Sequence, residues 1–219
     1  MTLALVLVAV AAAAWYIQQQ RGPGAGSSAA AEARRLRTPL VHLANLIGIE
    51  TARGRLADQW DAGATGEQRT AARLHPLTRH GWTVLHDRAL PTGRANVDHL
   101  LISPSGVVVV GDTKRWSARY PVTVRNGRLM HGNRDVTTWL RGLHHETRTV
   151  AKALGCPAIP VIFMDGAPIP AGQLLFEGIR IVPADQALTA LCSIARRHRA
   201  CGEHPGRRAA ALFTPYGRT

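Results

Sequence analysis

Two acidic residues and a lysine have the types and the spacing for chemistry on a phosphodiester. Asp112 and Lys114 end the apolar segment 107–114, and their two-residue spacing places both side chains on one face of a strand. Asp98 lies in the preceding apolar segment, 95–103. Two carboxylates supply the oxygen ligands that Mg²⁺ or Mn²⁺ prefers, and a lysine stabilises the negative charge of a phosphoryl transition state. These residues therefore predict a metal-dependent phosphodiesterase, with both aspartates as metal ligands and all three as catalytic residues.

A tight turn must bring these residues together. The residues Pro104-Ser105-Gly106 separate the two apolar segments and predict a hairpin between them. Pairing of Ser103 with Val107 would place Asp98 beside Asp112. Four consecutive valines in the second segment predict a strand that is buried on both faces, at the centre of a sheet. The alternative interpretation is a structural salt bridge between the acid and the lysine that end this segment.

The surrounding segments predict helices packed on a mixed sheet. Thr65 is a candidate N-cap for a helix from Gly66 to Leu77, which Pro76 would end. Asn126-Gly127 predicts a hairpin between 122–125 and 128–131. Further strands are expected at 82–87, 159–164 and 178–182, and further helices at 135–154 and 183–198. The expected fold class is α/β (α+β), with a central mixed sheet flanked by helices.

The charge balance favours a polyanionic partner. The 27 lysines and arginines exceed the 14 acidic residues, which gives a formal charge of +13. Nucleic acid or an anionic membrane face would suit this surface. A hydrophobic content of 46% excludes a wholly disordered chain. The sequence contains no GxxxxGK[ST] loop, so it gives no indication of an ATP-driven motor. Arg94, Arg115 and Arg119 are candidate phosphate-binding residues, with a solvated basic surface as the alternative. Core packing is expected for Trp116 and Trp139, with base stacking as the alternative.

The cysteines do not predict a disulfide scaffold. Cys156, Cys192 and Cys201 are too few and too scattered, which is typical of a reducing compartment. A zinc site at Cys192, His198, Cys201 and His204 is disfavoured because their spacing fits none of the common structural patterns. The apolar helical pattern around Cys192 predicts a core thiol instead.

The N-terminal segment predicts a membrane anchor. Residues 1–17 are uncharged and apolar, and the first charge is Arg21. A helix over residues 1–20 would be long enough to approach the thickness of a bilayer core. A cleaved signal peptide is the alternative, although the segment has no positive n-region. Because arginines dominate the charges that follow, we expect a single-pass protein of the cell membrane, with its N-terminus outside and its body in the cytoplasm.

Four regions follow from these patterns. Residues 1–20 are the transmembrane anchor, and residues 21–60 are a flexible linker with short helices. Residues 61–198 are the α/β domain, and residues 199–219 are a loosely ordered basic tail.

Six short motifs follow one another between residues 66 and 114: Gly66-Glu67, Gly81-Trp82, Leu90-Pro91, Asn96-Val97-Asp98-His99-Leu100-Leu101, Ser103-Pro104-Ser105-Gly106-Val107 and Asp112-Thr113-Lys114. Together they resemble the nuclease-related domain (NERD) family, a branch of the PD-(D/E)XK nuclease superfamily. The resemblance covers about residues 64–130 and extends towards residue 197. It implies a PD-(D/E)XK-like core of helices and a mixed sheet, a divalent metal ion and phosphodiester cleavage.

The resemblance also implies a role for each site residue. Asp98 and Asp112 match the metal ligands and Lys114 matches the catalytic lysine. Glu67 matches an additional acidic residue on the helix before the first core strand. Relatives more often carry glutamate where this chain has Asp112, which is one methylene shorter. The expected function is a membrane-tethered, Mg²⁺- or Mn²⁺-dependent nuclease acting on nucleic acid, with DNA favoured. The alternatives are an inactive nuclease-like module that binds nucleic acid or protein at the membrane, and a structural protein that only grips lipid headgroups.

Overall fold

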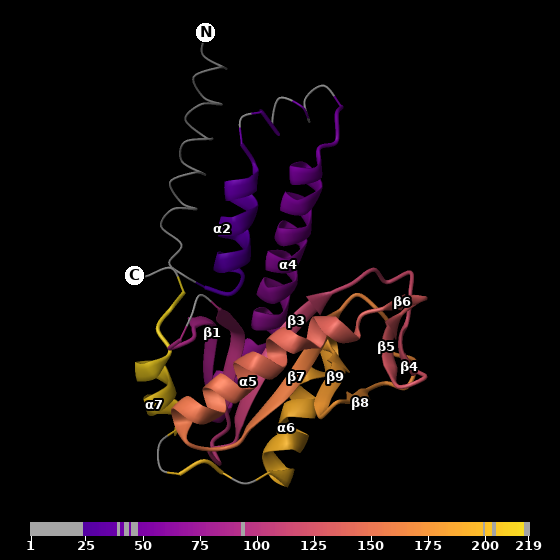
Figure 1. The fold of residues 1–219 in the computed structure, drawn as a ribbon. Helices are drawn as coiled ribbons and strands as arrows, with labels where there is room; N and C mark the ends of the chain where they lie inside the picture. Colours follow the sequence, from indigo (N-terminus) through magenta and orange to yellow (C-terminus); the bar gives the residue numbers. More distant parts are fainter. Residues whose placement is uncertain are drawn as a thin grey trace.

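A mixed six-stranded sheet forms the centre of the protein. The computed structural model describes residues 24–38, 40–41, 44, 48–92, 95–198, 200–202 and 205–216. The strand order is β1-β2-β3-β7-β9-β8 (Figure 1). The strands from β1 to β3 are antiparallel, β3, β7 and β9 run parallel, and β8 is antiparallel to β9. Their bounds are β1 Thr83–Ala89, β2 Asn96–Ile102, β3 Val108–Arg115, β7 Ala158–Asp165, β8 Leu174–Phe176 and β9 Ile179–Pro183.

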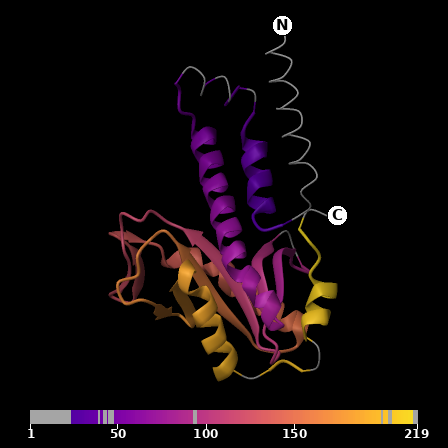
Figure 2. The same ribbon diagram turned by 180° about the vertical axis from the view of Figure 1, so that it is seen from behind.

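Helices cover both faces of this sheet, so the predicted mixed sheet flanked by helices is confirmed. On one face lie α5 (Arg141–Leu154) and α7 (Pro205–Leu212), which share a hydrophobic cluster with the sheet. On the other face lie α4 (Ala52–Leu74) and α6 (Ala187–Arg197), with a second cluster (Figure 2). A further helix, α2 (Ser27–Leu36), packs along α4, and the two rise together from one end of the sheet (Figures 1 and 2).

The valine strand lies inside the sheet, as predicted. Val108 and Val110 of β3 belong to the cluster on the α5 face, whereas Val107 and Val109 belong to the cluster on the α4 face. Burial on both faces explains why this strand is continuously apolar rather than alternating.

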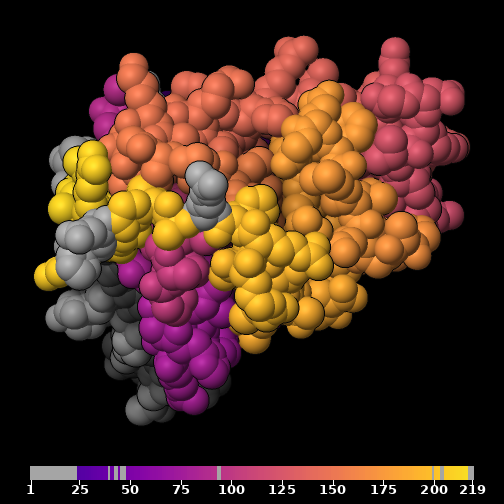
Figure 3. Space-filling view, turned by 90° about the horizontal axis from the view of Figure 1, so that it is seen from below, coloured from indigo at the N-terminus to yellow at the C-terminus, as the bar shows by residue number. Residues whose placement is uncertain are grey.

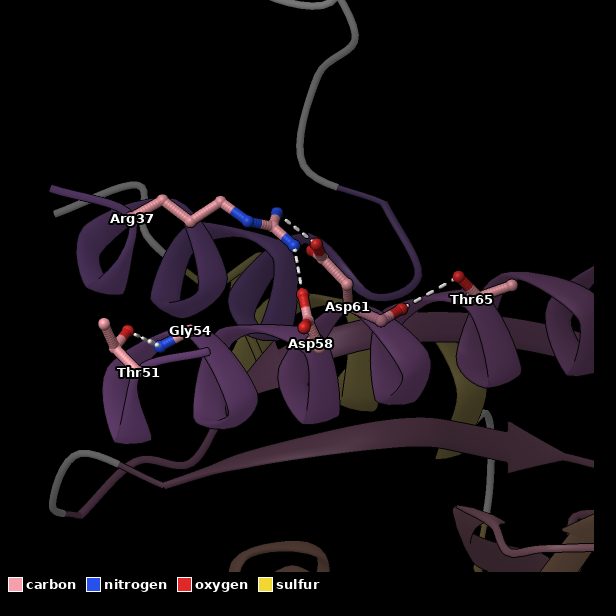
Figure 4. A network of polar contacts seen from close by, with 6 residues as sticks. All are labelled: Arg37, Thr51, Gly54, Asp58, Asp61 and Thr65. Atoms are coloured by element: carbon pink, nitrogen blue, oxygen red, sulfur yellow. Dashed lines mark hydrogen bonds and ion pairs between the residues drawn. The ribbon is translucent and has the colours of Figure 1, made fainter. Parts of the chain in front are cut away.

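The helix α4 begins fourteen residues earlier than predicted. Thr51, rather than Thr65, is the N-cap, and its hydroxyl accepts a hydrogen bond from the Gly54 amide at 3.0 Å (Figure 4). The Thr65 hydroxyl instead donates to the Asp61 carbonyl one turn back, inside the helix. The helix ends at Leu74, and a 3₁₀ turn (His75–His80) contains Pro76, which cannot donate the next helical hydrogen bond. The expected boundary between residues 60 and 61 therefore falls within one continuous helix.

Part of the predicted linker is a docked helix. α2 begins at Ser27, and its N-cap, Gly26, has no side chain to cap it. The fully buried Asp87 of β1 caps it instead, accepting hydrogen bonds from the Ser28 amide at 2.7 Å and from the Ser27 hydroxyl. The Asn96 side chain donates to the other oxygen of Asp87 at 2.8 Å. Farther along, Arg37 forms ion pairs with two aspartates of α4, so the linker is fixed to the domain at both ends of α2 (Figure 4).

A small three-stranded sheet projects from one side of the domain, and we refer to it as the β4–β6 lobe. It contains β4 (Val122–Arg125), β5 (Arg128–His131) and β6 (Arg134–Asp135). Asn126 and Gly127 both have positive φ angles, 51° and 69°, which confirms the predicted hairpin turn. The helix expected to begin at residue 135 starts as a 3₁₀ turn (Thr137–Leu140), after which α5 follows. Figure 3 shows the lobe and the C-terminal residues on opposite sides of the molecule.

The described part of the predicted tail is folded rather than loose. Cys201 forms a disulfide with Cys156, just beyond the end of α5. α7 follows, Phe213 is fully buried, and Pro215 pairs with Arg88 of β1. One disulfide therefore forms although the cysteines do not predict a disulfide scaffold, because the chain after α6 returns to α5. Pairing with Cys156 also removes Cys201 from the disfavoured zinc set, and Cys192 is exposed rather than a core thiol.

The predicted membrane anchor, residues 1–20, lies outside the described residues, as does Arg94. Among the helices that the structure does describe, none has the length and apolar character needed to span a bilayer.

Candidate active site

The register between β2 and β3 places the two predicted aspartates opposite each other. His99 pairs with Gly111 and the Ser103 amide donates to the Val107 carbonyl at 2.9 Å, as the turn predicted. One further step along this register sets Asp98 beside Asp112. There the Oδ2 atom of Asp98 accepts the Thr113 amide hydrogen at 3.0 Å, so a side chain takes a place in the strand pairing.

Lys114 lies directly on Asp112. Its Nζ atom is 2.6 Å from Oδ2 and 2.9 Å from Oδ1 of that carboxylate. Asp112 is almost completely buried, whereas the Lys114 side chain keeps 26% of its surface exposed. The pair lies near the end of β3, and both side chains share one face of the strand, as the two-residue spacing predicts. The ion pair of the structural alternative is therefore present, together with the acids described next.

The helix α4 carries Glu67 to the same place. Its preceding residue, Gly66, allows the close approach, because a Cβ atom there would lie 3.0 Å from Arg115 Cβ and 3.3 Å from Thr113 Cγ2. Glu67 is buried, and one carboxylate oxygen interacts with the backbone of Gly26. Its other oxygen, Oε2, is buried without a hydrogen-bond partner. An unpaired buried carboxylate oxygen is energetically unfavourable and is typical of a site that binds a ligand or ion.

A fourth acid, Glu146 of α5, was missed by the sequence analysis. It lies beside the buried stripe formed by Leu143, Thr147 and Val150. The available signal was an acid next to the apolar face of a helix that must cover the sheet. Glu146 shares one cavity with the predicted acids and the lysine.

This cavity, which we call the acid pocket, has a volume of about 530 Å³. Its polar lining includes Glu67, Asp98, Asp112, Lys114 and Glu146. Its apolar lining includes Leu56, Trp60 and Trp139, which are 43%, 42% and 40% exposed. The buried acids thus line a cavity together with partly exposed apolar side chains, rather than lying within the hydrophobic core.

Crowded negative charge dominates the acid pocket. Burial, reinforced by Asp87 and Asp112, raises the pKa of Glu67 to about 7. Burial, reinforced by Asp112, raises the pKa of Glu146 to about 8. Burial and the charges of Glu67 and Asp112 likewise raise the pKa of Asp98. Burial opposes the charge of Lys114, but the neighbouring aspartates outweigh it and raise its pKa. Lys114 is therefore the cation in direct contact with these acids, since its Nζ atom lies on Asp112.

The residues of the acid pocket fit a hard divalent cation. They offer oxygen ligands, an excess of negative charge and one unpaired carboxylate oxygen, all of which favour Mg²⁺ or Mn²⁺. Within the described residues, however, no three His, Cys, Asp or Glu side chains already converge as a preformed ligand group. The physical reason is visible in the contacts, since Lys114 covers Asp112 and the Thr113 amide holds one oxygen of Asp98.

The other predicted side chains are placed as follows. Arg115 lines the acid pocket, and its Nε atom lies 3.9 Å from Asp165 Oδ2. Arg119 is exposed near Tyr120. His99 is fully buried, and its Nε2 atom hydrogen-bonds to the Thr113 hydroxyl at 2.9 Å, so it is a core residue.

Comparison with known proteins identifies the domain. Residues 62–163 match the family model of the nuclease-related domain. This match confirms the resemblance seen in the motifs and includes Glu67, Asp98, Asp112, Lys114 and Glu146. No curated protein and no solved structure matches the chain.

Proposed function

We propose that this chain is a metal-dependent nuclease that hydrolyses nucleic acid phosphodiesters, because residues 62–163 match the family model of the nuclease-related domain. One observation carries the proposal. Four acids from two strands and two helices meet around one lysine in an open pocket. A salt bridge that only stabilised the fold would need one acid, and the additional buried carboxylates would destabilise it.

Each residue has a distinct role in this proposal. Asp98 and Asp112 would hold Mg²⁺ or Mn²⁺, and Glu67 and Glu146 would supply further oxygen atoms nearby. The metal ion, when bound, supplies polarisation of the phosphodiester and a lower pKa for water. Lys114 stabilises the negative charge that develops on the phosphate oxygens and helps to orient the attacking water. Arg94, Arg115 and Arg119 would neutralise phosphates along the substrate.

We also propose that residues 1–20 anchor the chain in the cell membrane with the domain in the cytoplasm. The support is the uncharged segment followed by arginines. The next described helix, α2, begins at Ser27 and is fixed to β1 through Asp87, so the domain would sit close to the bilayer. A reporter fused after Thr219 should be active only in the cytoplasm, and activity outside would overturn this orientation.

A cleavage assay tests the nuclease proposal. The full chain would be incubated with labelled DNA and RNA in Mg²⁺, Mn²⁺ or EDTA, together with Asp112→Asn and Lys114→Ala. We expect cleavage that requires metal and falls at least about a hundredfold in both variants, since each removes charge stabilisation of the transition state. Lys152→Ala is the matched control, because Lys152 is the only other lysine and is exposed.

Two results of this assay would contradict the proposal. Equal cleavage by folded Asp112→Asn and by the unchanged chain would show that the acid pocket is not the active site. Salt-sensitive binding without cleavage under any metal would favour the inactive nucleic-acid-binding module instead.

A further inference from the structure

Four aromatic rings form a connected row that leads out of the acid pocket. The ring centroids of Trp139 and Trp116 are 5.5 Å apart, those of Trp116 and His131 are 5.2 Å apart, and those of His131 and Tyr120 are 5.8 Å apart. We call these four residues the aromatic row. Trp116 and Trp139 line the acid pocket, whereas His131 and Tyr120 line a second cavity of about 1000 Å³ over the β4–β6 lobe. The row therefore joins the two cavities.

An arginine lies over the ring at each end of the aromatic row. The Cζ atom of Arg134 lies 4.7 Å from the centre of the Trp139 ring, and that of Arg119 lies 5.7 Å from the centre of the Tyr120 ring. Residues 115–135 contain five arginines and one acidic residue, Asp135, which pairs with Arg128 at 2.9 Å. The surface beside the row is thus strongly positive and suits a chain of phosphates.

The ends of the aromatic row are exposed, yet the lobe holds them in place. Tyr120 is 46% exposed and Trp139 is 40% exposed, so core packing alone does not account for them. A Cβ atom at Gly132 would lie 3.0 Å from Tyr120 Cβ, which shows how closely the hairpin supports this ring. The His131 ring hydrogen-bonds to the Ser117 carbonyl at 3.1 Å. Rigid exposed rings can stack on a ligand without loss of much conformational entropy.

Resting on the proposed nuclease function, we propose that the aromatic row binds unpaired bases of a single-stranded nucleic acid whose backbone enters the acid pocket. Flat rings with an arginine at each end of the row match bases that are linked by phosphates, and stacking on aromatic side chains tolerates any base sequence. A duplex hides the faces of its bases within the stack, so it offers these rings nothing to stack on. The substrate class is therefore single-stranded DNA or RNA, or the unpaired arm of a branched duplex.

Binding measured apart from cleavage tests this inference. The full chain in detergent, carrying Asp112→Asn and kept in EDTA, would be titrated against fluorescein-labelled single strands of mixed-sequence DNA and RNA. A hairpin duplex with the same number of phosphates is the comparison. We expect tighter binding of at least one single strand than of the duplex. Tyr120→Ala and Trp139→Ala should each raise the single-strand Kd about 5- to 150-fold, the range found for loss of one base-stacking ring.

Matched variants separate stacking from charge and from folding. Tyr120→Phe and Trp139→Phe keep a ring and should retain most of the affinity. Arg119→Ala should reduce the slope of log Kd against log[salt] by about 0.7, which is the value for loss of one phosphate contact on a single strand. It should change the preference for single strands over duplex less than the alanine variants of the rings do. Leu212→Ala, which removes an exposed apolar side chain of α7 on the opposite side of the domain, should change nothing.

The outcomes distinguish this inference from the proposed function. Unchanged affinity in the folded alanine variants, or duplex binding at least as tight as single-strand binding, would overturn the role of the aromatic row even if cleavage is observed. Single-strand binding that depends on the rings would support the role of the aromatic row. If the chain with Asp112 unchanged then shows no cleavage with any metal, only the nuclease proposal fails.

Discussion

The Nζ atom of Lys114 lies 2.6 Å and 2.9 Å from the two oxygens of Asp112, so one ammonium group covers the carboxylate that would bind a metal ion. The lysine and a divalent cation therefore compete for the same oxygens. A bound cation would have to displace the Lys114 ammonium, which could then turn towards a phosphate. Removal of Lys114 should therefore affect metal affinity and catalysis in opposite directions, because the ammonium group that competes with the metal ion would also stabilise the transition state.

The first prediction follows from this competition. Lys114→Met should bind Mn²⁺ more tightly than the unchanged chain and yet lose cleavage. Thermal unfolding in increasing Mn²⁺ measures binding, since an ion at a hundred times its Kd stabilises a protein by about 2.7 kcal/mol, or roughly 5–10 °C here. Asp112→Asn should lose most of the shift, and Lys152→Met should behave like the unchanged chain. A smaller shift in Lys114→Met would mean that the lysine helps to hold the ion.

The second prediction concerns the crowding of acids. Glu146→Gln should stabilise the metal-free protein by about 1–2 kcal/mol at pH 9, because it removes a half-buried negative charge from among like charges. The same change should reduce the Mn²⁺-induced shift. Glu177→Gln, an exposed acid outside the acid pocket, should alter stability by less than about 0.5 kcal/mol. Destabilisation by Glu146→Gln would show that this carboxylate supports the fold rather than the site.

Two glycines of α4 give the third prediction. Alanine usually stabilises a helix interior relative to glycine by about 0.5–1 kcal/mol, and Gly63 has open space around it. Gly63→Ala should therefore stabilise the protein. Gly66→Ala should destabilise it by about 1–3 kcal/mol, because the new methyl group would press against Arg115 and Thr113. Displacement of α4 would also move Glu67, so we expect a smaller Mn²⁺-induced shift. Equal effects at both positions would contradict the close packing.

Local sequence patterns identified the central site, but long-range contacts completed it. The turn at residues 104–106 sets the register between β2 and β3, so Asp98 and Asp112 could be paired from the sequence alone. Glu67 was found through family motifs, because nothing in its own helix shows which strand the helix crosses. Glu146 is not part of those motifs. Its helix, α5, comes after the β4–β6 lobe in the sequence and reaches the site only through tertiary packing.

The same distinction explains the errors outside the site. The cap on α2 comes from Asp87, about sixty residues away, so the segment read as a flexible linker. Cys156 and Cys201 are separated by 45 residues and meet only because the chain after α6 returns to α5. The predicted cap of α4, Thr65, lies inside the helix, which begins at Ala52. The choice between Thr51 and Thr65 depends on which hydroxyl accepts from an amide ahead of it.

The disulfide leads to the fourth prediction. Closing a 45-residue loop removes unfolded-state entropy worth about 4 kcal/mol, and native disulfides commonly contribute about 2–4 kcal/mol. A reducing agent should therefore lower the melting temperature by about 5–15 °C. Cys192→Ser should keep this response, and Cys156→Ser should abolish it. In the cytoplasm, where the proposed location places the domain, the pair would be kept reduced and this contribution would be absent. An unchanged melting temperature on reduction would argue against the bridge.

The fifth prediction is an acid-dependent loss of stability centred on His86. His86 is a half-buried residue of β1, and its Nδ1 atom lies 2.8 Å from Nδ1 of His99, its partner on β2. Burial, with repulsion from Arg88 and His75, lowers the pKa of His86 from 6.5 to about 4, although Asp87 opposes the shift. Between these two pH values the unfolded chain takes up a proton that the folded chain does not. The contribution of neutral His86 is therefore complete above pH 6.5 and is lost as the pH falls towards 4.

A difference measurement isolates this effect. The free energy of unfolding of His86→Gln, compared with that of the unchanged chain, should fall less steeply between pH 6.5 and 4, by about 1–3 kcal/mol over the whole window. Glu67 and Glu146, whose pKa values are raised to about 7 and 8, titrate with the opposite sign, since they destabilise the fold as the pH rises above their usual range. Their contribution is common to both proteins and cancels in the difference. His145→Gln, at an exposed position of α5, is the control and should leave the pH dependence of the unfolding free energy unchanged. The same pH dependence for His86→Gln and the unchanged chain would show that His86 accepts its proton in the folded protein.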